Sequence, residues 1–193
     1  MQEAYYNERK GAGGDNVYKD PVKESISWMR VILLTVLIVL LSRHFLFEPV
    51  AVHGESMMPT FEENDKVMLS KVYSIDNFDM IVFTAPNGVN FIKRVIGIPG
   101  DKISIQDDQL YINGKAKLEP YLEKNYEAAK QMGMLRLTED FQEFTVPAES
   151  YFVLGDNRLN STDSRVIGFI SKETIIGEVT IRISPLEHMG MVK

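Results

Sequence analysis

The first segment able to do chemistry is Gly54–Thr60, which contains Ser56. Gly54 and Pro59 favour turns, so the hydroxyl of Ser56 is expected to be exposed on a constrained backbone. A serine becomes a nucleophile only when a base removes its proton. A nucleophile elbow needs glycine two residues after the serine, where this chain has Met58. Pro59 likewise excludes a Ser-x-x-Lys motif, and an ordinary surface turn is the alternative.

The second segment is Phe91–Asp101, and its candidate base is Lys93. In a strand, Lys93 shares a face with Phe91 and Val95, whereas Arg94 points to the opposite face. Apolar neighbours desolvate an amine and lower its pKa, which would let Lys93 accept a proton near neutral pH. An edge-strand lysine with its amine in water is the alternative.

The third segment, Gly155–Arg165, is dense in side chains that form hydrogen bonds. Such density indicates a buried polar network or a loop closed by an Asp–Arg pair, although turn chemistry explains part of it. A calcium loop is disfavoured because the acidic spacing does not match an EF-hand and Arg158 would oppose a cation. We therefore predict no metal site.

The composition narrows the function classes. The chain has 193 residues, of which 45% are hydrophobic and 25% charged, as in ordinary globular proteins. It has 27 acidic and 21 basic residues and a formal charge of −6. No basic surface for a nucleic-acid backbone is indicated, so no nucleic-acid partner is expected. The chain has no cysteine, which excludes thiolate nucleophiles, disulfides and cysteine zinc sites.

The elements that must position these residues are mainly strands. Period-two alternation and frequent turn residues follow residue 48, with one helical stretch predicted at Tyr121–Met132. Asn113-Gly114 predicts a type I′ hairpin turn. The predicted strands are Lys66–Val72, Met80–Thr84, Val89–Ile96, Lys102–Ile105, Gln109–Ile112, Tyr151–Leu154 and Ile175–Ile183.

One apolar segment, Trp28–Phe47, is long enough to cross a membrane. About 20 residues at about 1.5 Å each span about 30 Å, the thickness of the hydrocarbon layer. Arg30 and Arg43 lie near its ends, where long side chains reach the headgroups. A buried core helix and a cleaved signal peptide are the alternatives.

Basic residues before this segment predict its orientation. Lysine and arginine are retained on the cytoplasmic side of a membrane helix. We therefore predict a cytoplasmic tail over 1–27, an anchor over 28–47 and an extracytoplasmic domain over 48–193, in a single-pass protein of the cell membrane. The basic residues concerned are Arg9, Lys10, Lys19, Lys23 and Arg30.

Together, the anchor and the three segments resemble type I signal peptidases, the membrane-anchored serine peptidases that remove signal peptides from exported proteins. The matching motifs are Gly-x-Ser-Met-x-Pro-Thr, Lys-Arg-Val-Ile-Gly-x-Pro-Gly-Asp and Gly-Asp-Asn-Arg-x-x-Ser-x-Asp-Ser-Arg. The resemblance runs from Phe45 to about Ile183 and looks like the Gram-positive branch. It implies a mainly β fold, with a coiled β catalytic core and a variable β region inserted at about 103–148. It implies no cofactor.

The resemblance also implies roles for individual residues. Ser56 would be the nucleophile and Lys93 the general base. Ser161 would place a hydroxyl beside the lysine amine, and Asp163 and Arg165 would form a structural salt bridge. The Ser56 backbone N–H would bind the oxyanion, and Gly54 lacks the hydroxyl that some members add.

The implied partners are the lipid bilayer and the signal peptides of exported preproteins, cut after small residues of the Ala-x-Ala type. The motif alignment assigns apolar residues to two substrate pockets. They are Val52, Met57, Phe61, Phe91 and Ile92 for the first pocket, and Val50, Val67 and Val82 for the other.

Three positions depart from the family pattern. Asn64 and Phe78 stand where glycine is usual before aspartate, and Leu159 takes a place that is often polar. None of them touches the proposed dyad.

Other functions remain open at this point. An anchored β domain that binds a partner without catalysis would not need Ser56 or Lys93. A self-cleaving LexA-type repressor would carry a helical DNA-binding module, for which the sequence gives no sign. A Ser–His mechanism would draw on His44, His53 or His188, of which the first two are not positioned as bases.

Overall fold

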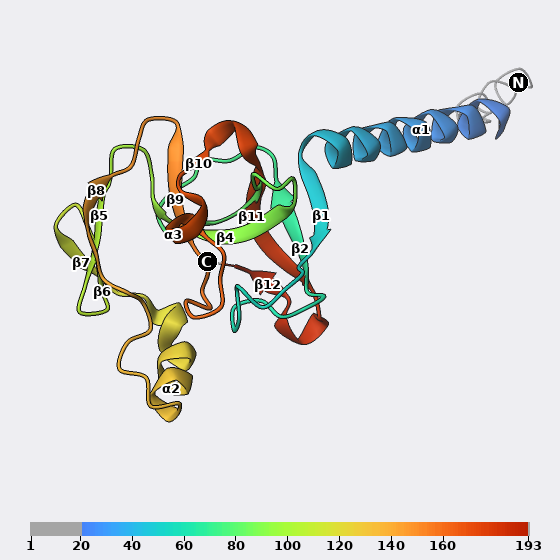
Figure 1. Cartoon of the computed structure of the whole chain (residues 1–193). Coiled ribbons are helices and arrows are strands. Elements are labelled where there is room, and N and C mark those ends of the chain that lie inside the picture. Colours follow the sequence, from blue (N-terminus) through green and yellow to red (C-terminus); the bar gives the residue numbers. More distant parts are fainter. Residues whose placement is uncertain (1–20, 193) are drawn as a thin grey trace, which may run out of the picture. The chain divides into compact units, whose positions relative to one another are not determined.

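The computed structural model describes residues 21–192, and the predicted tail residues 1–20 therefore lie outside the described part (Figure 1). That excluded part contains Arg9, Lys10 and Lys19. The chain divides into two compact units, residues 1–41 and 42–193. The first unit contains most of the helix α1 (Pro21–Phe45), and the second contains every strand described below.

Helix α1 is long and apolar enough to cross a membrane over Val22–Ser42, and none of that stretch is buried within the part of the chain that the structure describes. Inside the apolar stretch, the Thr35 hydroxyl donates to the Val31 carbonyl at 2.9 Å, which satisfies the polar group within the helix. The predicted segment began too late, because polar residues such as Glu24 continue the helix. It also ended too late, because Phe47 starts strand β1.

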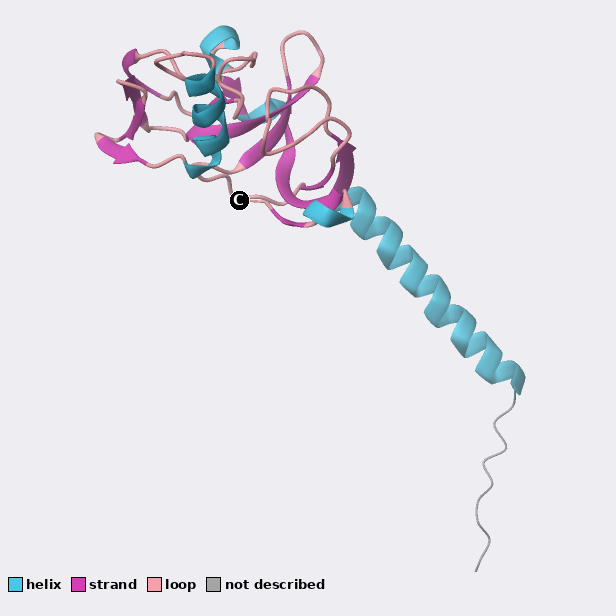
Figure 2. Ribbon diagram, turned by 90° about the horizontal axis from the view of Figure 1, so that it is seen from below, coloured by secondary structure: helices cyan, strands magenta, loops and turns pink. Residues whose placement is uncertain are grey.

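The main sheet is antiparallel and has the order β1-β2-β11-β3-β4-β9-β10, with β12 paired to β11. Irregular registers interrupt the pairing of β11 with β2 and β3, and of β4 with β9. The strands curve strongly (Figure 2), as expected of a coiled β core. Its strands are β1 (Phe47–Ala51), β2 (Lys66–Ser70), β3 (Met80–Thr84), β4 (Asn90–Gly97), β9 (Ser150–Leu154), β10 (Ile170–Ser171), β11 (Ile175–Ser184) and β12 (Gly190–Met191).

A second antiparallel sheet has the order β7-β6-β5-β8. It lies in the part of the chain where the sequence predicts the variable insertion. Asn113 and Gly114 join two of its strands with positive φ values of 53° and 72°, as the hairpin prediction requires. Its strands are β5 (Lys102–Gln106), β6 (Gln109–Ile112), β7 (Lys115–Lys117) and β8 (Phe141–Thr145).

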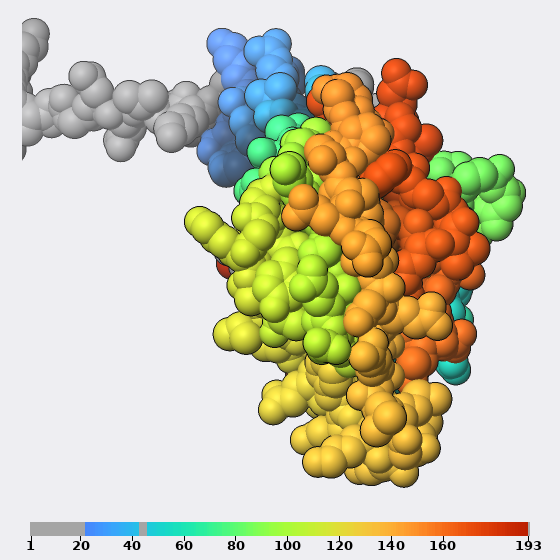
Figure 3. Space-filling view, turned by 60° about the vertical axis from the view of Figure 1, so that its left-hand side comes forward, coloured from blue at the N-terminus to red at the C-terminus, as the bar shows by residue number. Residues whose placement is uncertain are grey.

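Between β7 and β8 lies the predicted helical stretch, called the helical excursion below. It forms the lower end of the face shown in Figure 3. It consists of a short helix η1 (Pro120–Leu122) and helix α2 (Glu123–Gln131). Leu122 and Ala129 are buried against Leu137 in a small core of their own. The remaining short helices are α3 (Ser164–Ile167), η2 (Lys172–Thr174) and η3 (Leu186–His188).

The prediction of a mainly β protein with one N-terminal apolar helix is therefore confirmed, and each predicted strand is present within a residue or two of its bounds. The missed strands are mostly short or at sheet edges. Strand β1 contains Pro49, which weakens a strand pattern and is tolerated at an edge, where β1 lies.

Two of the family departures occupy special backbone positions. Asn64 has a φ of 69° and Phe78 a φ of 76°. Glycine adopts this left-handed region without steric cost, whereas a bulky residue such as phenylalanine is strained there. The usual glycine therefore has a backbone reason at both sites, and this chain accepts the strain at Phe78.

Candidate active site

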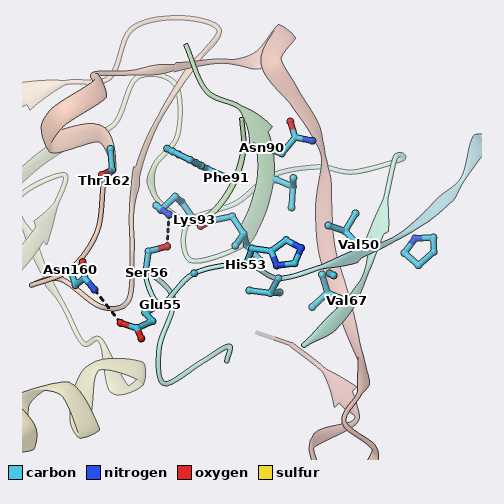
Figure 4. Close-up of a pocket in the computed structure, with 16 residues that line it drawn as sticks. Val50, His53, Glu55, Ser56, Val67, Asn90, Phe91, Lys93, Asn160 and Thr162 are labelled. Carbon is cyan, nitrogen blue, oxygen red and sulfur yellow. Dashed lines mark hydrogen bonds between the residues drawn. The ribbon is translucent and has the colours of Figure 1, made fainter. Parts of the chain in front are cut away.

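Ser56 and Lys93 come together at one end of an apolar cleft (Figure 4). Lys93 Nζ lies 2.6 Å from Ser56 Oγ and donates a second hydrogen bond to the Ile92 carbonyl at 2.9 Å. Lys93 lies on β4, which pairs with β3 on one side and β9 on the other. The edge-strand alternative is therefore wrong, and Lys93 is only 3% exposed.

Burial lowers the pKa of Lys93 to about 8, although the negative charges of Asp163 and Asp156 act in the opposite direction. The amine lies 5.1 Å from the centre of the Phe91 ring, one of the apolar neighbours expected from the strand pattern. A substantial fraction of the lysine is thus a neutral amine at mildly alkaline pH, in contact with a serine hydroxyl. This is the arrangement required of a general base and its nucleophile.

The turn that carries Ser56 is held by backbone contacts on both sides. Gly54, with a φ of +85°, donates its N–H to Glu63 Oε2 at 2.5 Å. The Ser56 carbonyl accepts a hydrogen bond from the Asn157 N–H at 3.0 Å. Gly155 allows this approach, since a Cβ there would lie 2.6 Å from the Ser56 carbonyl oxygen.

The third segment forms the predicted Asp–Arg pair. Asp163 has a fully buried side chain and accepts two hydrogen bonds from the Arg165 guanidinium, at 2.7 and 2.8 Å. It also accepts the Gly155 N–H at 3.0 Å, so the pair anchors the end of β9 beside the turn that carries Ser56. The Ser161 hydroxyl is buried next to Gly155. The Lys93 amine bonds to Ser56 and to the Ile92 carbonyl, whereas the Ser161 hydroxyl acts on Asp163 and helps to lower the pKa of that carboxyl.

The cleft has a volume of about 580 Å³ and an apolar floor. Polar side chains stand at its rim, where Asn160 donates to Glu55 at 3.3 Å (Figure 4). Six of the predicted pocket residues line the cleft, namely Val50, Val52, Val67, Val82, Phe91 and Ile92.

The two other predicted pocket residues, Met57 and Phe61, do not line the cleft. Both are fully buried in the core cluster beneath it, together with Val67 and Val82. The turn at Ser56 places the serine hydroxyl against Lys93 and the Met57 side chain in the interior. These two residues therefore support the floor of the cleft from below.

A charged network lies behind Ser56 and Lys93, and its partners were not predicted from the sequence. Arg94, on the opposite face of β4, forms a two-bond ion pair with Asp156 at 2.9 and 2.7 Å, and both side chains are 1% exposed. The guanidinium also donates to the Phe78 carbonyl at 2.9 Å and stacks 3.9 Å from the centre of the Tyr121 ring. Thr60 donates to the same Asp156 carboxylate.

The helical excursion completes this network. Arg158 pairs with Glu119 and donates to Thr138 at 3.0 Å. Asn125, on α2, donates to the carbonyls of Met58 and Asp156. The sequence offered no signal for these contacts, because they join segments that are far apart along the chain. Only the density of polar residues in Gly155–Arg165 pointed to a buried network.

The histidine alternative finds no support in the geometry. His53 lies at the cleft, but its Nδ1 is 3.1 Å from Glu63 Oε1, while Ser56 is bonded to Lys93. Within residues 21–192, no group of three or more His, Asp or Glu side chains could hold a metal ion.

Comparison with known proteins places the chain among relatives. The family described as "Signal peptidase, peptidase S26" matches residues 25–184. Signal peptidase I T of Bacillus subtilis (strain 168) is 38% identical over 192 residues, covering 96% of this chain and 99% of the relative. Signal peptidase I S of the same strain is 42% identical over 179 residues, covering 91% and 96%.

A solved structure agrees with these relatives. The crystal structure of a signal peptidase I from Enterococcus faecalis V583 is similar with a TM-score of 0.52 and 38% identity, covering 57% of this chain and 100% of that one. The family match spans most of the chain, and the relatives align along nearly their whole length. The chain therefore belongs to the signal peptidase family, peptidase S26.

Proposed function

We propose that this signal peptidase is a membrane-bound serine endopeptidase that removes signal peptides from exported preproteins, with Ser56 as nucleophile and Lys93 as general base. The observation that carries the proposal is the 2.6 Å contact between Lys93 Nζ and Ser56 Oγ, made by an amine whose pKa burial lowers to about 8. Family membership supports the reaction, and the geometry supports the residues that perform it.

In the first step, the neutral Lys93 amine takes the proton from Ser56 Oγ, which attacks the carbonyl carbon of the scissile bond. The resulting ammonium then protonates the leaving amine of the mature protein, and the C–N bond breaks. Water, deprotonated by the same amine, hydrolyses the acyl-enzyme and regenerates Ser56. Lys93 therefore returns to its neutral form at the end of each cycle.

The negative charge on the tetrahedral intermediate needs a fixed hydrogen-bond donor. The Ser56 backbone N–H is proposed for this role because it moves with the nucleophile. The Gly54 N–H is already bonded to Glu63 and is not a second donor in this arrangement.

The cleft supports selection of small side chains. Strand β1 ends the main sheet, so an extended substrate chain would pair with its outer edge. Alternate side chains of such a chain point to the same wall, and the first and third residues before the cut would meet it. That wall is built from aliphatic residues, including Val52, Val67 and Val82. Alanine at both positions fits this environment.

Helix α1 is proposed as the membrane anchor, with its N-terminal end in the cytoplasm and the catalytic unit on the extracytoplasmic face. The helix is long and apolar enough to span the bilayer. Lys23 and Arg30 lie in its N-terminal half, and basic residues favour the cytoplasmic side. This orientation would bring Ser56 to the compartment in which exported preproteins emerge.

The test is cleavage of a precursor with Ala-x-Ala before its mature start, by detergent-solubilised wild-type protein and by Ser56→Ala. We expect the wild type to cut after the second alanine and the variant to be inactive while remaining folded. A folded wild-type protein that leaves the precursor intact, or a Ser56→Ala variant that still cuts it, would contradict the proposal.

A further inference from the structure

Helix α2 reaches the back of the nucleophile turn through one side chain, that of Asn125. Its Nδ2 atom donates to the Met58 carbonyl at 3.0 Å and to the Asp156 carbonyl at 2.7 Å. Carbonyl oxygens only accept hydrogen bonds, so the amide nitrogen must face them, and both of its hydrogens are used. Asn125 therefore ties two separate segments together at one point.

These two segments are the ones that fix Ser56. Met58 belongs to the turn that carries the nucleophile, and its N–H donates to the Glu55 carbonyl at 3.0 Å. Asp156 precedes Asn157, whose N–H donates to the Ser56 carbonyl at 3.0 Å and whose side chain donates to the Glu55 carbonyl at 3.2 Å. The Asn125 bonds thus add a second crossing between the turn and the loop.

We propose that Asn125 is a positioning residue for the peptidase reaction, which clamps the turn of Ser56 against the loop that follows β9. This inference rests on the proposed function of the Ser56–Lys93 pair. It assigns the helical excursion a part in catalysis, because a helix outside the catalytic core sets the position of the nucleophile.

The helix itself does not explain an asparagine at this position. Asparagine is a poor helix former, and alanine would favour α2 more. Asn125 also lies outside the small apolar core formed by Leu122, Ala129 and Leu137. The amide supplies two hydrogen bonds, to the carbonyls of Met58 and Asp156, and these bonds hold the turn and the loop on either side of Ser56.

The test compares the steady-state kinetics of Asn125→Ala with those of the wild type and of Lys124→Ala, a matched control on the exposed neighbour in the same helix. We expect Asn125→Ala to lower kcat about tenfold and to change KM less than about twofold, because a small displacement of a reacting atom slows the chemical step. The cleft that binds substrate does not include Asn125. Lys124→Ala should match the wild type in both constants.

The pH profile distinguishes positioning from a loss of folded protein. A loosened turn would admit water to Lys93, whose lowered pKa depends on burial, so the rising limb of the profile should move to higher pH. The charged groups facing Lys93 are Asp156 and Asp163, and neither is altered. A variant that merely unfolds more easily would have a lower rate at every pH, and the rising limb of its pH–rate profile would stay in place.

Asn125→Asp gives the same test if the alanine variant does not fold. It preserves the size of the side chain, removes both donors and places a negative charge before two carbonyl oxygens, so we expect a larger loss of kcat. Either variant with wild-type kcat and an unmoved pH limb would overturn the inference. Failure of the wild type to cleave, or cleavage by Ser56→Ala, would instead contradict the proposed function.

Discussion

Lys93 and Arg94 are neighbours on β4 and point to opposite faces, where each cation is almost completely buried. The Lys93 amine contacts a serine hydroxyl and a backbone carbonyl. The Arg94 guanidinium contacts the carboxylate of Asp156 through two hydrogen bonds. One strand therefore presents an unpaired cation to the cleft and a paired cation to the network behind it.

The two environments have opposite electrostatic results. Burial lowers the pKa of Lys93 to about 8. Burial also acts to lower the pKa of Arg94, but the hydrogen bonds and charge of Asp156 outweigh it and raise that pKa. Desolvation without a contacting carboxylate thus prepares a base, whereas desolvation with one keeps the cation charged and structural.

The largest effect on activity should come from giving Lys93 the same guanidinium group that Arg94 carries. Lys93→Arg keeps a positive charge in the cleft, but a guanidinium stays protonated and cannot act as a base. We expect kcat/KM for an Ala-x-Ala precursor to fall by at least about 10³-fold. Lys93→Met, which is also expected to be inactive, controls for packing. Near-normal turnover by Lys93→Arg would show that Lys93 is not the base.

The next largest effect should come from unpairing the buried arginine. Asp156→Asn keeps the shape of the side chain but leaves the Arg94 charge without its carboxylate. We expect the free energy of unfolding, measured by urea denaturation, to fall by about 3–5 kcal/mol. Adding Arg94→Met to Asp156→Asn should recover part of the loss, since the uncompensated charge is then gone. An unchanged unfolding midpoint in Asp156→Asn would show that the pair is dispensable.

The cost of burying Lys93 should itself depend on pH. Its pKa falls from 10.5 to about 8 on folding, which corresponds to about 3 kcal/mol. Between these values the unfolded chain binds the proton and the folded chain does not, so stability rises with pH across that window. Wild type should therefore gain stability relative to Lys93→Met between pH 8 and pH 10.5. If the free energies of unfolding of the two proteins changed in parallel with pH over this range, the pKa of Lys93 would not be lowered by folding.

The smallest expected effect comes from Asp163, whose charge acts on Lys93 without a hydrogen bond to it. Asp163 raises the pKa of Lys93 through its charge, so Asp163→Asn should move the rising limb of the pH–rate profile to lower pH. The variant should also melt at lower temperature, because its ion pair with Arg165 is lost. A limb that moves to higher pH would mean that the loop, rather than the charge, dominates the effect of Asp163.

The local sequence pattern was enough to predict most of the secondary structure of this protein. The strand predictions depended on period-two alternation, the hairpin on Asn113-Gly114, and the apolar helix on a run of uncharged residues. Ser56 and Lys93 were predicted as nucleophile and base from their motifs, and the structure brings Lys93 Nζ to 2.6 Å from Ser56 Oγ. In each case the informative residues are close together in the chain.

The local sequence pattern did not predict whether an apolar side chain lines the cleft or packs in the core beneath it. Met57 and Phe61 were predicted to line the cleft but pack beneath it, since residue type does not distinguish a floor from the core that supports it. The positive φ of Phe78 was not predicted either, because phenylalanine itself gives no sign of a left-handed backbone and only the glycine usual at this place in the family pointed to one.

The sequence by itself thus determined the strands, the apolar helix, the family and the two residues proposed to react, because periodicity and motif spacing are properties of short stretches. Only the tertiary structure decided that Lys93 is buried without a contacting carboxylate while Arg94 meets Asp156, and that Asn125 reaches the turn of Ser56. Desolvation and pairing depend on which distant segments meet, and that is settled when the sheets and the helical excursion pack together.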